Sequence, residues 1–307
     1  MSAFSNRSRL AAILALAGAL AGLWVLWQRR PHSIAPGALL PYLPPASAAM
    51  VYLDVDGLRK AGILEKLSAA PAAQDPDYRS FIDATKFDYA RDLDAVLVSF
   101  QEHGTFMVLR GRFDWGALRR YAAAQGGACD NGPCRMEGSQ PDRKISFYEL
   151  RPGLMALAVA RDAYAAALIT RHGAVTGLDF PTSPVWFTIP PGELRKQALP
   201  SGTRTFASAL EGANRLWLSL DRGAADGYRL ALRVECRSEQ DARALANQLQ
   251  STTETLRKWI ARENQSPNPN DLSGLLTAGA FRHEGASVHG AWPIAPGFID
   301  NLTKGAL

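Results

Sequence analysis

The chain has 307 residues, of which 47% are hydrophobic and 21% are charged, as in a globular protein with no bias toward disorder. Its formal net charge is +5, but Arg7, Arg9, Arg29 and Arg30 lie in the first 31 residues, which contain no Asp or Glu. Removing these four from the 34 basic residues leaves 30, against 29 acidic residues. The body therefore has no surplus for a basic face, and we exclude a nucleic-acid partner.

An unbroken apolar run of 18 residues extends from Leu10 to Trp27. As a helix it would be about 27 Å long, close to the hydrocarbon thickness of a bilayer. We predict a short basic tail over residues 1–9 and a transmembrane anchor over residues 10–28. A cleaved signal peptide is the alternative, because residues 19–21 (Ala-Leu-Ala) resemble a cleavage site. The apolar run continues past this site, which favours a retained anchor.

Basic residues flank both ends of the apolar run, so the positive-inside rule does not decide its orientation. The short tail of a simple signal-anchor stays in the cytoplasm, which places the body outside it. We therefore predict a single-pass protein of the inner membrane with its body on the periplasmic or extracellular side. Gly18 and Gly22 have the G-x-x-x-G spacing that lets two membrane helices approach closely, although small residues are common in such helices anyway. Five prolines follow in residues 31–49, so residues 29–49 are predicted to be an extended spacer outside the fold.

The body is predicted to be a tandem duplication. A strand at Val51–Val55 leads into a helical segment, and Val185–Ile189 leads into another that repeats the tripeptide Leu-Arg-Lys. Each strand is followed by a hairpin, a helix, a second hairpin and a further helix. We assign the first copy to residues 50–171, a linker to residues 172–183 and the second copy to residues 184–307.

In the first copy, residues 93–125 read as two strands with a turn at His103-Gly104, then a helix capped by Asp114. Residues 144–160 form the second hairpin, and a helix is expected over residues 162–170.

In the second copy, a hairpin starts at Asn214, and Ser238 with Asp241 resembles a capping box for a long helix. A shorter hairpin turns at Glu284-Gly285, and a terminal helix follows Pro296.

The hairpin that starts at Asn214 alternates clearly between apolar and polar residues. Leucines at 216, 218, 220, 230 and 232 share one face, whereas polar residues, among them Arg215, Arg229 and Arg233, take the other. This pattern indicates an antiparallel sheet with one covered and one wet face, and Trp217 is an apolar exception on the wet face. The predicted class is α+β, with helices on one face of each sheet. The pattern leaves open whether the two sheets merge.

Cys129 and Cys134 enclose a Gly-Pro turn, which favours a local disulfide and an oxidising compartment. Two reduced loop thiols are the alternative. The spacing is not that of a C-x-x-C redox or zinc motif, and Cys236 is interpreted as a core residue.

Other polar groups favour structural roles. His283, Glu284 and His289 are interrupted by a turn, which argues against a metal site. Asp54 alternates with strand residues and Asp56 stands at a helix start, so they are not interpreted as paired catalytic carboxylates. The string Asp88, Asp92, Asp94 is interpreted as a solvated loop. No nucleotide-binding, metalloprotease or nucleophile-elbow motif is present, and we predict neither a metal nor a cofactor.

The segment Leu43-Pro44-Pro45-Ala46-Ser47-Ala48-Ala49-Met50, continuing into Val51–Val55, resembles the entry to bacterial membrane-anchored extracytoplasmic families without an assigned function. In these families an L-P-x-x-A segment leads into repeated α+β units, so the resemblance implies a location and no activity.

Two functions remain. We favour a non-catalytic module that binds an envelope protein or component through a surface of Trp217, Arg215, Arg229 and Arg233. The alternative is an envelope enzyme, hydrolase-like, with a site between the copies. It would require polar groups such as His172, His283, His289 and Asp54 to converge.

Overall fold

The structure is a computed structural model, and it describes residues 36–45, 47–68, 76–129, 132–138, 140, 142–172, 179–190, 213–223 and 227–304. The predicted tail, the predicted anchor with Gly18 and Gly22, and the first part of the predicted spacer lie outside these residues. So does the segment 191–212, where a helix was expected to follow the strand at Val185–Ile189. Within the described ranges, no helix is long and apolar enough to cross a membrane.

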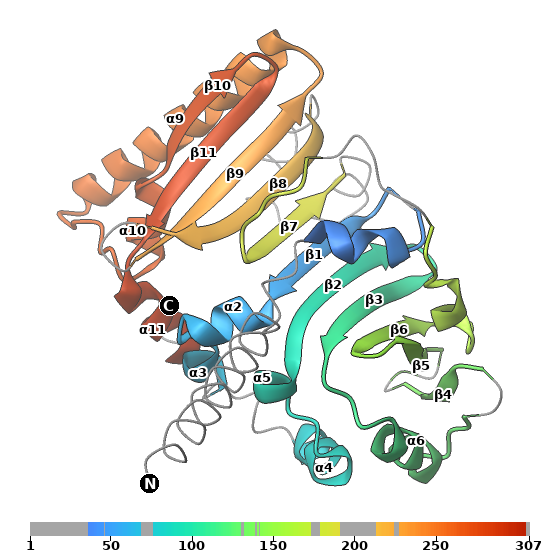
Figure 1. The fold of residues 1–307 in the computed structure, drawn as a ribbon. Coiled ribbons are helices and arrows are strands. Elements are labelled where there is room, and N and C mark those ends of the chain that lie inside the picture. The colour runs from blue at the N-terminus through green and yellow to red at the C-terminus, as the bar shows by residue number, and fades with distance from the viewer. Residues whose placement is uncertain are drawn as a thin grey trace, which may run out of the picture. The chain divides into compact units, whose positions relative to one another are not determined.

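The described strands form one continuous antiparallel sheet (Figure 1). They are β1 (Ala49–Asp54), β2 (Leu93–Gln101), β3 (Gly104–Gly111), β4 (Cys134–Glu137), β5 (Lys144–Arg151), β6 (Leu154–Ala160), β7 (Val185–Ile189), β8 (Ala213–Arg222), β9 (Tyr228–Cys236), β10 (Ala280–Glu284) and β11 (Ser287–Ile294). The predicted hairpins are confirmed, and the class is a mixed α+β fold with a large antiparallel sheet.

The question of merging is decided by β1 and β7, which pair antiparallel in the middle of the sheet. The strand order is β10-β11-β9-β8-β7-β1-β2-β3-β6-β5-β4. Residues 49–160 therefore occupy one half of the sheet and residues 185–294 the other.

The described α-helices are α2 (Val55–Lys60), α3 (Ile63–Ser68), α4 (Pro76–Thr85), α5 (Tyr89–Asp92), α6 (Trp115–Ala124), α9 (Glu239–Arg262), α10 (Leu272–Thr277) and α11 (Pro296–Lys304). Side-chain caps begin α2, α5, α6, α9 and α10. The Asp114 carboxylate accepts a hydrogen bond from the Ala117 amide at 2.9 Å, and the Ser238 hydroxyl accepts one from the Asp241 amide at 3.1 Å. Both caps satisfy amides that have no partner within the helix.

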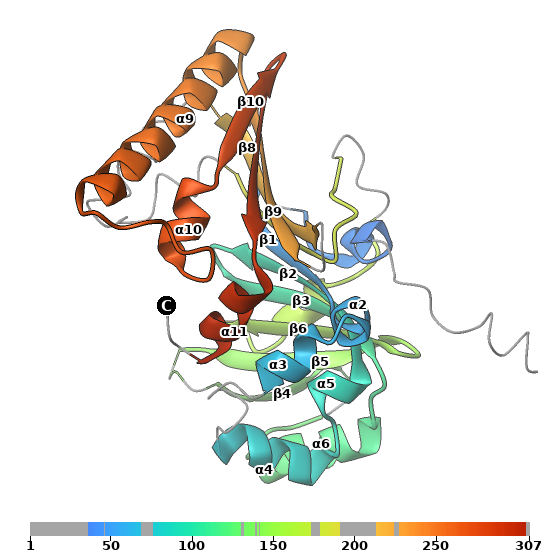
Figure 2. The same ribbon diagram turned by 90° about the vertical axis from the view of Figure 1, so that its left-hand side faces the viewer.

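One face of the sheet carries three apolar clusters. On β8, β9 and β11 it is covered by α9, whose Leu245 and Leu249 pack near Val234 and Val288. Figure 2 shows α9 lying along that side of the sheet. Farther along the sheet, α2 and α3 cover β1 and β2, and α6 covers β5 and β6. This arrangement agrees with the predicted helices on one face.

The opposite face is also covered over β1, β2, β3 and β6, which differs from the expected wet face. Its cover includes two short 3-10 helices, η1 (Pro36–Ala38) and η2 (Leu40–Tyr42). Leu39 is fully buried, and Leu40 and Leu43 are nearly so. The interpretation of this stretch as an extended spacer is therefore wrong for residues 36–45, because its leucines provide an apolar surface that the sheet buries.

A second part of that cover follows β6. Instead of the expected helix over residues 162–170, only a 3-10 turn, η4 (Ala165–Leu168), forms. It is fastened to the sheet by side chains of β5: the Ser146 hydroxyl accepts from the Ala166 amide at 2.9 Å, and the Tyr148 hydroxyl donates to the Ile169 carbonyl at 2.6 Å. These bonds compete with a longer helix for the same backbone groups.

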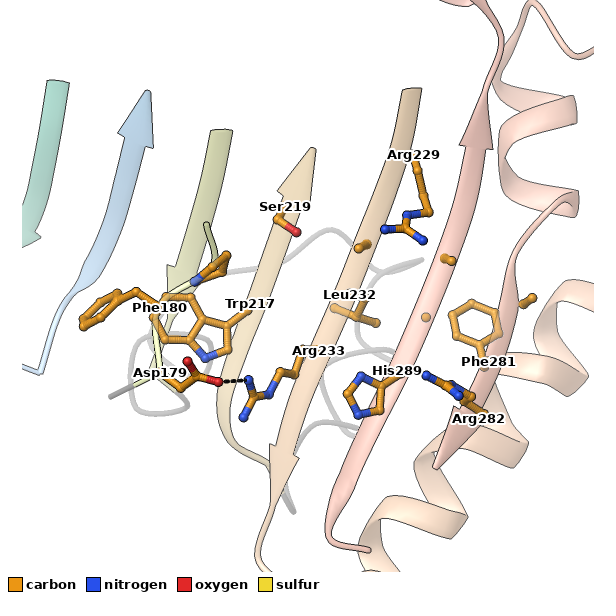
Figure 3. A pocket seen from close by; sticks show the side chains of 15 residues that line it. Asp179, Phe180, Trp217, Ser219, Arg229, Leu232, Arg233, Phe281, Arg282 and His289 are labelled. Carbon is orange, nitrogen blue, oxygen red and sulfur yellow. Dashed lines mark hydrogen bonds and ion pairs between the residues drawn. The ribbon is translucent and has the colours of Figure 1, made fainter. Parts of the chain in front are cut away.

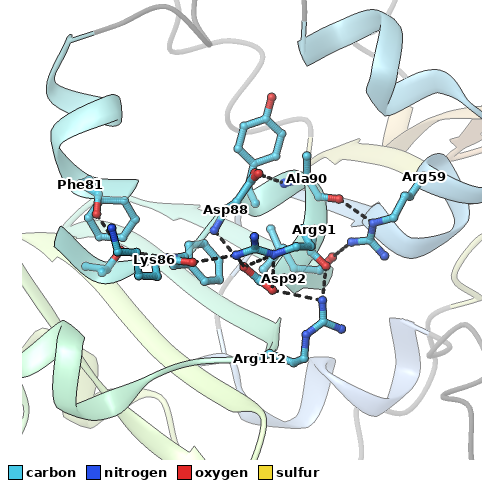
Figure 4. Close-up of polar contacts among 12 residues, drawn as sticks. Arg59, Phe81, Lys86, Asp88, Ala90, Arg91, Asp92 and Arg112 are labelled. Atoms are coloured by element: carbon cyan, nitrogen blue, oxygen red, sulfur yellow. Dashed lines mark hydrogen bonds and ion pairs between the residues drawn. The ribbon is translucent and has the colours of Figure 1, made fainter. Parts of the chain in front are cut away.

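A polar corner joins α5 to the strands beside it (Figure 4). The Asp92 carboxylate accepts hydrogen bonds from Arg91, from Arg112 and from the Asp88 amide. Arg59 reaches the same corner and donates to the Ala90 carbonyl at 2.6 Å. Asp92 is only 8% exposed, so the interpretation of this acidic string as a solvated loop is wrong at this residue.

Candidate functional site

Four aromatic side chains lie at the end of the covered part of the sheet face opposite α9. Trp186 stacks on Tyr52 at 5.7 Å between ring centroids and meets Trp217 edge-on at 5.5 Å. Phe180 lies against both indoles, at 5.5 Å from Trp186 and 5.2 Å from Trp217. Trp217 is consequently only 2% exposed, and the expectation of an exposed tryptophan on this face is wrong because Phe180 packs on it.

Beyond the aromatic cluster the face opens into a cavity (Figure 3). Its floor is a row of small residues on four adjacent strands. Ser219 on β8 pairs with Ala231 on β9, which pairs with Ala291 on β11, and that residue pairs with Ala280 on β10. Because paired residues on neighbouring antiparallel strands point to the same face, these four form one shallow furrow across the strands. We call this furrow and its walls the trough.

A row of larger side chains forms one long wall of the trough. It runs, by the same pairings, through Trp217, Arg233, His289 and Arg282. Arg229 stands across the furrow, paired with Pro293 and Asp221. In Figure 3, Arg233, His289 and Arg282 lie on one side and Arg229 on the other, with Phe180 and Trp217 at one end.

The arginines of the trough differ in how fully they are paired. Arg233 donates to the Asp179 carboxylate at 2.8 Å and lies 3.3 Å from that of Glu235. Arg229 is 3.9 Å from Asp221. Arg282 has neither a hydrogen bond nor an ion pair to any described residue. Among the arginines of the trough, Arg282 therefore has the fewest ionic contacts with the described part of the chain.

Two buried donors in the wall also have no hydrogen-bond partner within the described part of the chain: the Trp217 indole nitrogen and the Arg233 Nε. An unsatisfied buried donor costs roughly 1–3 kcal/mol. The wall of the trough thus contains two buried donors that the described part of the chain leaves unpaired.

His289 lies between the two arginines of its row. Burial holds its pKa below the usual 6.5, and the neighbouring Arg282 and Arg233 lower it further while Glu284 opposes them. At neutral pH the imidazole is therefore uncharged.

The trough encloses about 460 Å³, within the usual range for small-molecule sites. A second cavity of about 730 Å³ shares Arg229, Ala280 and Ala291 with it. That cavity continues beside Pro293 and Tyr228, and its lining is mainly apolar. The two hollows are contiguous along the end of β11.

The surface predicted from the sequence overlaps this site. Arg229, Arg233 and Trp217 line the trough, and Arg215 lies over the Trp217 ring at 5.7 Å. Sequence reasoning missed Arg282, Phe180 and the role of His289 as a wall residue. The alternation in residues 280–294 places Arg282 and His289 on the correct face, but the register between β9 and β11 was needed to join them to the arginines of β9. Phe180 precedes β7, and no pattern in the sequence marks it.

The polar residues that an enzymatic site would have required do not converge. The Asp54 carboxylate caps α2 at 2.9 Å from the Gly57 amide, and the His172 ring contacts the Leu168 carbonyl. His283 alternates with Arg282 on β10 and thus faces the α9 side, opposite to His289. Asp54 on β1 and His289 on β11 are separated by three strands, which is a distance of about 19 Å at the usual strand spacing. Asp56 pairs with Arg59 and Lys60.

The remaining predicted residues are placed as follows. Cys129 and Cys134 are joined as a disulfide, and Cys236 is buried as expected for a core residue. No group of three or more His, Cys, Asp or Glu side chains in the described ranges is arranged to hold a metal ion.

Comparisons with known proteins give structural neighbours only. No family model matches the chain, and no curated protein matches it. Crystal form III of TP0453 has a TM-score of 0.48 at 11% identity, covering 86% of this chain and 96% of that chain. Crystal form I of the same protein has a TM-score of 0.44 at 12% identity, covering 88% and 98%. At these values the likeness transfers neither family nor function.

Proposed function

We propose that this chain is a membrane-anchored extracytoplasmic protein that binds a ligand in the trough and does no chemistry on it. The observation that carries the proposal is the trough itself, where three arginines and an aromatic end surround a floor of small side chains. Small-molecule sites typically combine an apolar lining with a few polar groups in this way.

The location within the cell rests on two features. The apolar run of residues 10–27 is long enough to span a bilayer, which is the expected lipid partner of the protein. The disulfide between Cys129 and Cys134 fits an oxidising compartment. Both support an inner-membrane anchor with the body on the periplasmic or extracellular side.

We also propose that residues 50–171 and 184–307 are tandem copies. The order β1-β2-β3-β6-β5 in the first is matched strand for strand by β7-β8-β9-β11-β10 in the second. The two copies meet at the first strand of each. An experimentally determined structure in which β7 superposes on any strand other than β1 would contradict this proposal.

Thiol labelling in intact cells tests the location. Asn247 is exposed on α9, and the native cysteines are either disulfide-bonded or buried. The variant Asn247→Cys should react with a membrane-impermeant maleimide before the cells are lysed. Labelling that requires lysis would place the body in the cytoplasm instead.

Photocrosslinking in the producing cells tests the binding site. A diazirine amino acid in place of Ala291, on the trough floor, should form an adduct of defined mass. The matched control replaces Ala244, which is exposed on α9, and should not form that adduct. If Ala291 yields no adduct, or if both positions yield the same one, the trough is not a binding site.

A further inference from the structure

We infer that the ligand of the trough is an anionic amphiphile, with a carboxylate or phosphate headgroup on Arg282 and a single apolar chain lying over the furrow. This inference rests on the proposed binding function and names the chemistry of the ligand. Three separate features of the trough support it: an arginine without an ion pair in the described part of the chain, the shape of the floor, and the apolar wall at the far end.

The headgroup position follows from the charges. Arg233 already donates to one carboxylate, that of Asp179 (Figure 3). Arg282 is one strand beyond His289 on the other side and has no such partner in the described chain. An anion over His289 would lie between two guanidinium groups about 10 Å apart at their Cα atoms, within reach of both long side chains. Guanidinium groups bind carboxylates and phosphates with paired hydrogen bonds.

The chain position follows from the floor. The row from Ala280 to Ser219 crosses three strand intervals, about 14 Å at the usual spacing. That length is comparable with an extended medium-chain alkyl group. Because every side chain in the row is small, an apolar chain can lie on it without displacing packed residues.

The apolar wall sets the direction of the ligand. Phe180, Pro181 and Trp217 line the trough at its β8 end, whereas Arg282 is exposed on the edge strand β10. A ligand with its headgroup at Arg282 keeps the charge near water and buries its chain against the aromatic rings, which the hydrophobic effect favours. A cationic amphiphile would face three arginines and is excluded.

Calorimetric titration of the full chain in nanodiscs tests the inference, with matched empty nanodiscs subtracted. The probes are dodecanoate, dodecyl phosphate, dodecanol and dodecyltrimethylammonium. We expect at least one anionic probe to bind saturably and dodecanol to bind at least about tenfold more weakly, because it lacks a charge-assisted hydrogen bond. The preference between the two anionic probes identifies the headgroup.

Variants locate the headgroup. Arg282→Gln should weaken the anionic probe by about tenfold or more and leave dodecanol unchanged, and Arg282→Lys should restore part of the affinity. Arg243→Gln removes the same charge from the exposed side of α9 and should have no effect. Binding should also raise the pKa of His289 in an NMR titration, since an anion beside an imidazole favours its protonated form.

The outcomes separate the two proposals. If Ala291 crosslinks a ligand in cells but dodecanol binds as well as the anions, or Arg282→Gln has no effect, the ligand class is wrong and the binding function stands. If the crosslink and all four probes fail with folded protein, both proposals are wrong.

Discussion

Asp92 provides a quantitative test of how the corner at α5 stabilises the fold. Hydrogen bonds from Arg91, together with those from the Asp88 amide and Arg112, lower the pKa of the Asp92 carboxyl from 3.8 to about 2, although its burial opposes the shift. The difference corresponds to about 2.4 kcal/mol in favour of the folded state when the group is ionised. Arg91 and Arg112 are each 64% exposed, so solvent screening reduces the expected contribution to about 1–2 kcal/mol.

The substitution Asp92→Asn keeps the shape of the side chain and removes its charge. A depressed pKa contributes stability above the unfolded value near 3.8, and this contribution is lost as the pH falls through about 2. The variant should therefore be less stable than the native protein by about 1–2 kcal/mol at neutral pH, and the difference should vanish near pH 2.

Urea denaturation of the full chain in non-ionic detergent, followed by tryptophan fluorescence, measures this difference across the pH range. Asp83→Asn is the matched control, because Asp83 is exposed on α4, and it should change stability little at any pH. A loss of stability by Asp92→Asn that persists unchanged in acid would show that packing, and not charge, is responsible. No loss at neutral pH would refute the role of the corner altogether.

Three further results are expected. Gly274→Ala should cost about 1–3 kcal/mol in urea denaturation, because its Cβ would lie 2.1 Å from a backbone carbonyl oxygen, whereas Gly37→Ala meets nothing within 4 Å and should cost little. Alkylation before reduction should leave Cys129 and Cys134 unmodified in mass spectra, and replacing both with Ser should cost about 2 kcal/mol; modification of both would exclude the disulfide. An NMR titration should place the pKa of His289 below 6.5, so the protein should lose stability as the pH falls through that region, and a normal value would contradict the burial of this ring.

The local elements of the fold were predictable because their causes lie within a few residues. Asp114 and Ser238 cap helices through amides three residues away, and the turn before Gly104 separates two alternating apolar runs. Glycines at 153 and 285 adopt positive φ in the turns of the β5–β6 and β10–β11 hairpins, where residues with a Cβ are disfavoured. The helix expected over residues 162–170 does not form, because the side chains of Ser146 and Tyr148 on strand β5 of the preceding hairpin hold that backbone in a tighter turn.

The candidate site was predictable only in part. Alternation in residues 214–236 placed Arg229 and Arg233 on one face together with Trp217, and the structure confirms that arrangement. Arg282 and His289 joined them through a strand pairing between residues more than fifty positions apart. No local pattern contains that register.

By itself, the sequence determined the positions of most strands and of the helices capped by Asp114 and Ser238, the side of the sheet on which most strand residues lie, and the concentration of positive charge before residue 31. Tertiary structure alone decided that β1 pairs with β7, that leucines 39, 40 and 43 cover the second face, and that Phe180 buries Trp217. The physical reason is the range of the interactions. Backbone periodicity and capping act between neighbouring residues, whereas strand register and the cover of an apolar face depend on segments brought together only when the chain buries its core.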